Sequence, residues 1–182
     1  MAAMTETLYT PDDLLTMPDG DQYELVDGHL VARSMGTWAG TVEVKLTILI
    51  YNLVVSKSGG HVFSSAASYR CFPGDRVRKP DVSFIAAGRL PDGRVPEGHI
   101  TIIPDLAVEV VSPTDLQYDV DRKVADYLAV GVRLVWVVNP DTRVVLIYRL
   151  DGSIAGAREG GDLDGEGVIP GFRCPVAALF TP

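Results

Sequence analysis

Cysteine and histidine are scarce in this chain of 182 residues, and their scarcity excludes several kinds of functional site. The two cysteines, Cys71 and Cys174, stand far apart without the CxxC spacing of zinc and redox motifs, so we interpret both as small buried apolar residues. The three histidines, His29, His61 and His99, are also scattered. Ordinary surface or strand positions are the simpler interpretation, and no histidine-based metal site is predicted.

Long apolar segments and a secretory leader are missing as well. The apolar runs at residues 46–55 and 134–138 are shorter than the roughly 20 residues that a membrane-spanning helix needs, and Asn52 interrupts the first. Residues 1–10 lack the basic start and apolar stretch of a secretory signal. We therefore expect a soluble, cytoplasmic protein with no membrane partner.

Positive charge is in deficit, because 16 lysines and arginines face 24 acids and leave a net charge of −8. This balance argues against a protein that coats nucleic acid, since affinity for phosphates comes largely from clustered cations. The cations are nevertheless concentrated in residues 70–80, immediately before Asp81, whereas residues 151–167 are acidic. A solvated face is the simpler interpretation of this basic segment, and contact with phosphates is the alternative. Both apply to its four cations, Arg70, Arg76, Arg78 and Lys79.

The composition, 47% hydrophobic and 22% charged, fits one globular domain spanning residues 1–182. Thr10-Pro11 followed by two aspartates predicts a short helix over residues 10–17. The Asp27-Gly28 turn predicts a hairpin of strands 22–26 and 29–33, which contains Glu24.

Helical spacing of apolar residues predicts two longer helices, residues 38–57 and 119–130, each followed by glycine. The chain between 87 and 98 is expected to be a surface loop, and the Gly-rich acidic segment 151–167 an irregular excursion. Strands are predicted at residues 61–65, 68–72, 81–85, 106–111, 134–138 and 144–149. This order predicts an α/β (α+β) fold, a mixed sheet flanked by helices with strand 106–111 near its centre.

One acid breaks the apolar strand at the predicted centre of the sheet. Glu109 stands among valines, where a carboxylate is costly unless it is paired, protonated or bound to a metal. Asp81 opens another predicted strand, and adjacent strands would bring the two carboxylates together on one face. Mg²⁺ prefers such oxygen ligands, and Lys123 on the following helix could orient the attacking water.

Each of these residues also has a purely structural interpretation. Asp81 could cap a turn after Pro80, Glu109 could pair with a buried arginine, and Lys123 could be a solvated helix residue. What favours a site is their combination with a known pattern of motifs.

That combination resembles the PD-(D/E)XK nuclease superfamily and, more closely, the Uma-type restriction endonuclease family. The resemblance covers nearly the whole chain and is carried by an ordered set of segments, residues 23–28, 79–84, 104–113, 119–127 and 131–140. It implies a nuclease in which Asp81 and Glu109 bind Mg²⁺ or Mn²⁺. It further implies that Glu24 contributes a third acid, as a ligand or an orienting group.

The chain departs from the superfamily pattern at two places. The lysine of the basic pattern stands two residues after the glutamate, where this chain has Val111, so the resemblance makes Lys123 a migrated catalytic lysine. Similar proteins often carry a histidine before the long helix, and residues 34–41 contain none.

The sequence thus predicts a Mg²⁺-dependent endonuclease that hydrolyses DNA phosphodiester bonds. A non-catalytic binding or regulatory module of the same fold is the alternative, which the charge of −8 favours, and a hydrolase of small phosphorylated molecules is a third. Gln117 and Tyr118 are expected in a loop beside the site. The oligomeric state stays open, although a homodimer would let a small domain address both strands of a duplex.

Overall fold

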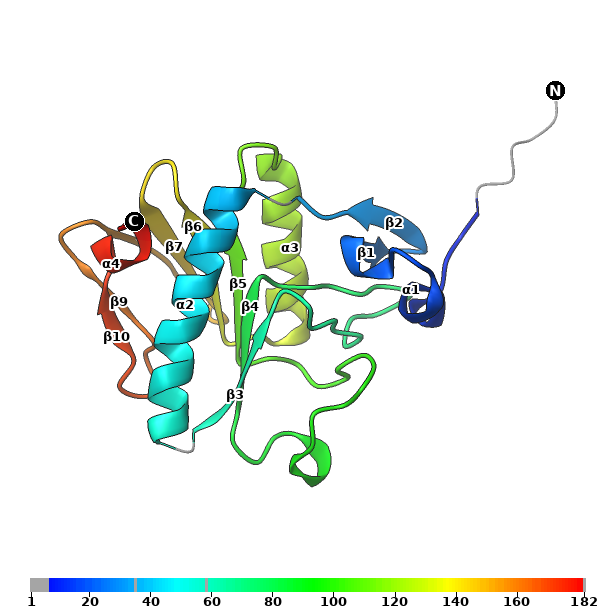
Figure 1. The fold of residues 1–182 in the computed structure, drawn as a ribbon, viewed down its shortest axis with the longest axis horizontal. Helices are drawn as coiled ribbons and strands as arrows, with labels where there is room; N and C mark the ends of the chain where they lie inside the picture. The colour runs from blue at the N-terminus through cyan, green and yellow to red at the C-terminus, as the bar shows by residue number, and fades with distance from the viewer. Residues whose placement is uncertain (1–6, 35, 58, 182) are drawn as a thin grey trace.

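The computed structural model describes residues 7–34, 36–57 and 59–181, and its centre is a six-stranded mixed sheet (Figure 1). The strands follow the order β3-β4-β5-β6-β7-β8. Neighbours are antiparallel except β5 and β6, which are parallel. The predicted fold class, a mixed sheet flanked by helices, is confirmed. The strand bounds are β3 Gly60–Ser64, β4 Val82–Ala86, β5 Leu106–Val110, β6 Leu134–Asn139, β7 Val144–Arg149 and β8 Ile154–Arg158.

The parallel pair β5 and β6 is the most deeply buried part of the sheet. All residues of β5 are buried, as are those of β6 up to Val138. Such continuous apolar strands are typical of parallel pairs that are covered on both faces. The crossover between them contains α3 Gln117–Val130, which ends at Gly131 in the left-handed conformation that glycine adopts without strain (φ 101°).

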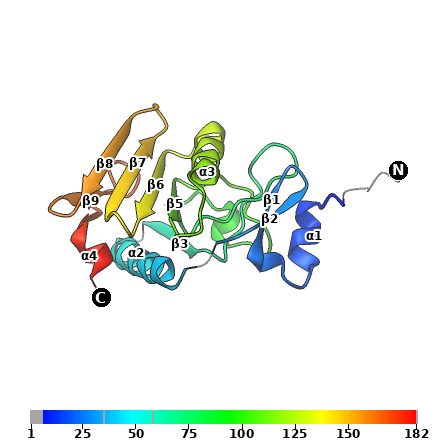
Figure 2. The same cartoon turned by 90° about the horizontal axis from the view of Figure 1, so that it is seen from above.

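Helices α2 Thr37–Ser56 and α3 cover opposite faces of the sheet (Figure 2). Because successive side chains of a strand point to opposite faces, Val108 of β5 joins the core under α2, whereas Ala107 joins the core under α3. Glu109 follows in the same alternation and therefore faces α3. The sequence position of a single carboxylate thus decides on which side of the sheet a site can form.

Helix α2 is long and apolar enough, by length and composition alone, to cross a membrane. The core helix of a soluble protein passes the same test. Here Val42, Leu46, Ile50 and Val54 are buried against the sheet at helical spacing. The predicted helix over residues 38–57 is confirmed, with its start one residue earlier.

The N-terminal part forms a small lobe beside the sheet. The predicted short helix is confirmed as α1 Pro11–Thr16, and Thr10 and Asp13 form a reciprocal capping box at its start. The predicted hairpin is confirmed as β1 Tyr23–Val26 and β2 His29–Ala32. It is tied to the rest of the chain where Leu25 forms an antiparallel bridge with Val77.

Three predicted segments differ in the structure. Residues 68–72 are not a strand, because only Tyr69 forms isolated bridges, to Arg78 and Ile100. Residues 151–167 are not an irregular excursion but contain β8 and β9 Asp162–Asp164, since backbone pairing overrides their polar, Gly-rich sequence. The chain then continues through β10 Arg173–Pro175, which pairs with β9, to α4 Ala177–Phe180.

The third difference concerns the start of α3. The helix begins at Gln117, so Gln117 and Tyr118 are helical rather than in a loop. Cys174 is buried, as predicted, whereas Cys71 is only partly buried.

Candidate active site

Asp81 lies directly before β4, opposite Glu109. The register that pairs Val82 with Val108 places these two acids opposite each other when it is continued by one residue. The Oδ2 atom of Asp81 accepts a hydrogen bond from the backbone N–H of Val110 at 2.7 Å. Its other oxygen, Oδ1, lies 3.6 Å from the Arg33 guanidinium. The predicted convergence of two carboxylates on adjacent strands is what the structure shows.

Glu109 is held by two residues of α3 that lie one helical turn apart. The Lys123 ammonium donates to Oε2 at 2.8 Å, and the Tyr127 hydroxyl donates to Oε1 at 2.6 Å. Positions i and i+4 of a helix share one face, so α3 presents both donors to the strand beneath it. Lys123 therefore lies where the prediction of a migrated lysine puts it.

Glu24 reaches the same cluster from β1 but is engaged by cations. Its Oε2 accepts from Arg78 at 2.8 Å and its Oε1 accepts from the backbone N–H of Lys79 at 2.8 Å. The Lys123 ammonium lies 3.7 Å from Oε1. Arg78 also pairs with Asp126 of α3, so Glu24 is part of a buried network that joins the hairpin to the helix.

The charges of the cluster shift the pKa values of its members in opposite directions. Burial, aided by the negative charge of Glu109, raises the pKa of Asp81 to about 8. Burial raises the pKa of Glu109 as well, although the positive charge of the nearby Lys123 acts to lower it. Although burial opposes it, Glu109 and Glu24 raise the pKa of Lys123, which therefore stays protonated. Burial is likewise outweighed at Glu24, where Lys123 and Arg78 lower the pKa.

The donor set fits a hard divalent cation. Asp81 and Glu109 supply two carboxylates whose mutual repulsion a cation would relieve, and Mg²⁺ is commonly held by one or two carboxylates with water completing its shell. Among the described residues no group of three or more His, Cys, Asp or Glu side chains could hold a metal. Glu24 is not among the residues that line the small cavity at Asp81 and Glu109, so it fits the orienting part of its predicted role better than that of a ligand.

Two residues of the site were not predicted from the sequence, Arg33 and Tyr127. The Arg33 side chain is only 11% exposed and lines the same small cavity as Asp81, Glu109 and Lys123. Tyr127 could have been found, because it lies four residues after Lys123 on a predicted helix. Arg33 directly follows β2 of the hairpin, and its sequence position alone gave no sign that it turns toward the acids.

The basic segment before Asp81 is occupied within the chain. Arg70 pairs with Asp12, Arg76 with Asp27 and Asp126, and the Lys79 ammonium donates to the Gly20 carbonyl at 2.7 Å. Arg78 is committed to Glu24 and Asp126, as described above. The interpretation of the segment as a solvated face is wrong for Arg78 and Lys79, which are buried. Contact with phosphates stays a prediction for the more exposed Arg70 and Arg76.

The protein has a six-stranded mixed sheet with helices on both faces, and Asp81 and Glu109 lie opposite each other at the neighbouring strands β4 and β5. This is a restriction-endonuclease-like architecture. The chain belongs to the Uma2 family, described as "Putative restriction endonuclease", which matches residues 11–177. A crystal structure of "a putative nuclease belonging to DUF820" from Anabaena variabilis is similar in fold, with a TM-score of 0.78 and 22% sequence identity. The similarity covers 94% of this chain and 97% of that chain. No curated protein matches the chain.

Proposed function

We propose that this protein is a metal-dependent endonuclease that hydrolyses DNA phosphodiester bonds. The observation that carries the proposal is the arrangement of Asp81 opposite Glu109, with the Lys123 ammonium 2.8 Å from Glu109. Membership of the Uma2 family supports a nuclease. We further propose that the reaction requires a divalent metal and that its substrate is DNA.

Asp81 and Glu109 would hold Mg²⁺ or Mn²⁺, which when bound polarises a phosphoryl oxygen and makes water more acidic. Lys123 keeps its proton and presents a fixed positive charge beside Glu109, where negative charge develops as water attacks. Tyr127 fixes the orientation of Glu109 by occupying the oxygen that Lys123 does not contact. Arg33, facing Asp81, is suited to pair with a phosphate oxygen of the substrate.

Glu24 has a different part in the proposal. Glu24 does not contact the reacting atoms. It keeps the Lys123 ammonium between two carboxylates, 3.7 Å from Oε1 of Glu24 and 2.8 Å from Oε2 of Glu109. A lysine fixed in this way loses little conformational entropy when the substrate binds. Glu24 is therefore proposed as a positioning residue.

Cleavage of supercoiled and single-stranded circular DNA with Mg²⁺ or Mn²⁺ tests the proposal. The wild type should cut, whereas Asp81→Ala, Glu109→Ala and Lys123→Ala should each lose activity. Arg70→Ala is the matched control, since Arg70 is a cation in an exposed ion pair with Asp12 outside the site. If the wild type neither cuts nor binds metal by calorimetry, the non-catalytic module of the same fold becomes the better account.

A further inference from the structure

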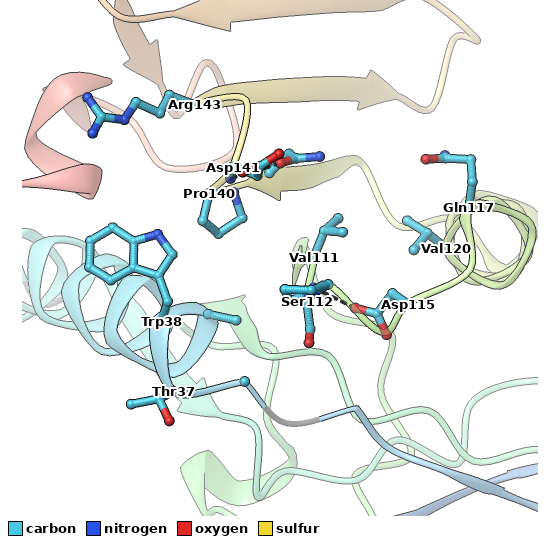
Figure 3. A pocket seen from close by; sticks show the side chains of 14 residues that line it. Thr37, Trp38, Val111, Ser112, Asp115, Gln117, Val120, Pro140, Asp141 and Arg143 are labelled. Atoms are coloured by element: carbon cyan, nitrogen blue, oxygen red, sulfur yellow. Dashed lines mark hydrogen bonds between the residues drawn. The ribbon is translucent and has the colours of Figure 1, made fainter.

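A larger cavity of about 820 Å³ adjoins the acids. It lies at the carboxyl ends of β5 and β6, the only parallel pair of the six-stranded sheet, and its lining residues include 37–39 of α2 and Gln117 and Val120 of α3. In Figure 3, Trp38 forms one side and Val120 with Gln117 the other. A crevice beyond the carboxyl ends of parallel strands, flanked by helices on opposite faces, is a common ligand position in α/β proteins.

The two cavities differ in what they can hold. The one at the acids has about 40 Å³, enough for an ion or a water molecule but not for a ring. The larger one falls within the ~300–1,000 Å³ of small-molecule sites. Both are lined by Val111, Asp115 and Val120. A substrate that places a phosphate at the acids would therefore direct the adjoining part of its chain into the larger cavity.

The charges of the larger cavity favour an uncharged group. It is lined by two acids, Asp115 and Asp141, and by one cation, Arg143, which is already paired with Glu159 at 3.0 Å. A second phosphate would be repelled there. An uncharged ring with N–H groups would not, because carboxylates accept hydrogen bonds from the amino groups of bases.

Trp38 supplies an aromatic surface to this cavity. Trp38 is the second residue of α2 and is 41% exposed. The Lys45 ammonium lies 5.7 Å from the centroid of its ring. Aromatic side chains of this kind stack with bases of single strands, whereas bases inside a duplex already have both faces covered.

We propose that this cavity binds an unpaired nucleobase next to the scissile phosphate, stacked on Trp38. The inference rests on the proposed nuclease function and deepens it, because it makes single-stranded or locally unpaired nucleic acid the preferred substrate. Gln117 lines the cavity, and because its Nε2 atom already donates to Asp121 at 2.7 Å, its Oε1 atom is the group that would accept a hydrogen bond from the edge of the base.

Tryptophan fluorescence tests the proposal without cleavage. The chain has two tryptophans, and Trp136 is fully buried, so a change caused by a ligand in the cavity reports on Trp38. The protein is titrated in EDTA with a short oligodeoxycytidylate and with an oligomer of equal length made of abasic sites. Both probes carry the same phosphates, and only the first carries bases.

The oligodeoxycytidylate should quench Trp38 and bind at least about 5-fold more tightly than the abasic oligomer, the lower end of base–aromatic stacking. Because variants of Trp38 lack this signal, their binding is measured by the fluorescence anisotropy of an end-labelled oligomer. Trp38→Ala should weaken binding of the oligodeoxycytidylate to a similar degree, while Trp38→Phe, which keeps an aromatic plane, should change it little. Tyr51→Ala is the matched control, because Tyr51 is an exposed aromatic residue on the same helix and does not line the cavity.

Equal binding of both probes, or binding that Trp38→Ala leaves unchanged, would overturn the base site. The two proposals fail separately in this design. Quenching by the oligodeoxycytidylate in a protein that cuts no DNA would contradict the nuclease alone, whereas metal-dependent cleavage unaffected by Trp38→Ala on single strands would contradict the base site alone.

Discussion

The Tyr127 hydroxyl lies 2.6 Å from the Glu109 carboxylate and donates a hydrogen bond to its Oε1 atom. Tyr127 is fully buried, and Glu109 is almost so. One side chain on α3 thus fixes the orientation of an acid on β5 and leaves the other oxygen of that acid to Lys123.

Replacing Tyr127 with Phe should reduce both activity and stability. The loss of one hydrogen bond to a buried charged group is expected to lower the free energy of unfolding by about 1.5–3 kcal/mol. Cleavage should fall by roughly 10-fold, because Glu109 gains freedom to rotate away from the metal position. Rates at saturating Mn²⁺ and urea unfolding measure the two effects. A variant with wild-type kcat and lowered stability would show that Tyr127 serves only the fold.

Replacing Lys123 with Met should abolish cleavage and strengthen the pH dependence of stability. Without the ammonium, Glu109 and Glu24 lose a shared cation, so one of them must take up a proton at neutral pH. We expect cleavage to fall by about 100-fold or more, as when a group that stabilises transition-state charge is removed. Lys123→Arg is the matched variant, and partial activity in it would support the role of the charge. Unchanged cleavage by Lys123→Met would exclude Lys123 from catalysis.

In EDTA, the free energy of unfolding should fall as pH rises from about 4 to about 8, because Asp81 has a pKa of about 8 when folded and 3.8 otherwise. The folded state binds this proton more tightly than the unfolded state does. The contribution is therefore complete below the unfolded pKa and is lost as pH rises through the folded one. Burial raises the pKa of Glu109 too, which adds to the same slope.

Urea unfolding across this pH range measures the effect. Asp81→Asn should flatten the slope, since it removes the titrating group and keeps the shape of the side chain. Asp92→Asn is the control, because Asp92 lies in an exposed turn. Mg²⁺ or Mn²⁺ should restore stability at the alkaline end, where the carboxylates are free to bind it. A slope that survives in Asp81→Asn would assign it to other groups.

Removing Arg78 should destabilise the protein more than removing any exposed arginine. Its side chain is 3% exposed and it pairs with Glu24 and Asp126, so Arg78→Met removes the nearest cation of Glu24 and leaves Asp126 with Arg76 alone. A loss of about 3–5 kcal/mol is expected, against about 1 kcal/mol or less for Arg70→Ala at the surface. Thermal or urea unfolding gives both values. Similar losses in the two variants would contradict a structural role of the buried network.

Local sequence signals predicted most of the elements. The capping box at Thr10, the Asp27-Gly28 turn and the apolar spacing of α2 each depend on neighbours within one or two turns, and each appears in the structure. Residues 151–167 were predicted wrongly, although the partners of their strands lie nearby in the sequence: β8 forms a hairpin with β7, and β9 pairs with β10. The Asp151-Gly152 dipeptide between β7 and β8 is a hairpin signal like Asp27-Gly28, and the polar, Gly-rich composition of the segment obscured it.

The sequence by itself determined that a carboxylate stands inside an apolar strand at Glu109 and, through alternation along that strand, that Glu109 and Ala107 share one face of the sheet. For Asp81 and Lys123 the sequence left a structural interpretation open, and strand pairing and the docking of α3 brought both to Glu109. Only the tertiary structure decided that Arg33 and Tyr127 join them, that the basic residues before Asp81 are neutralised internally, and that Trp38 lines a cavity beside the acids. The physical reason is that side-chain alternation along a strand and the face of a helix are local properties, whereas ion pairing and cavity shape depend on which distant segments the packing of the core brings together.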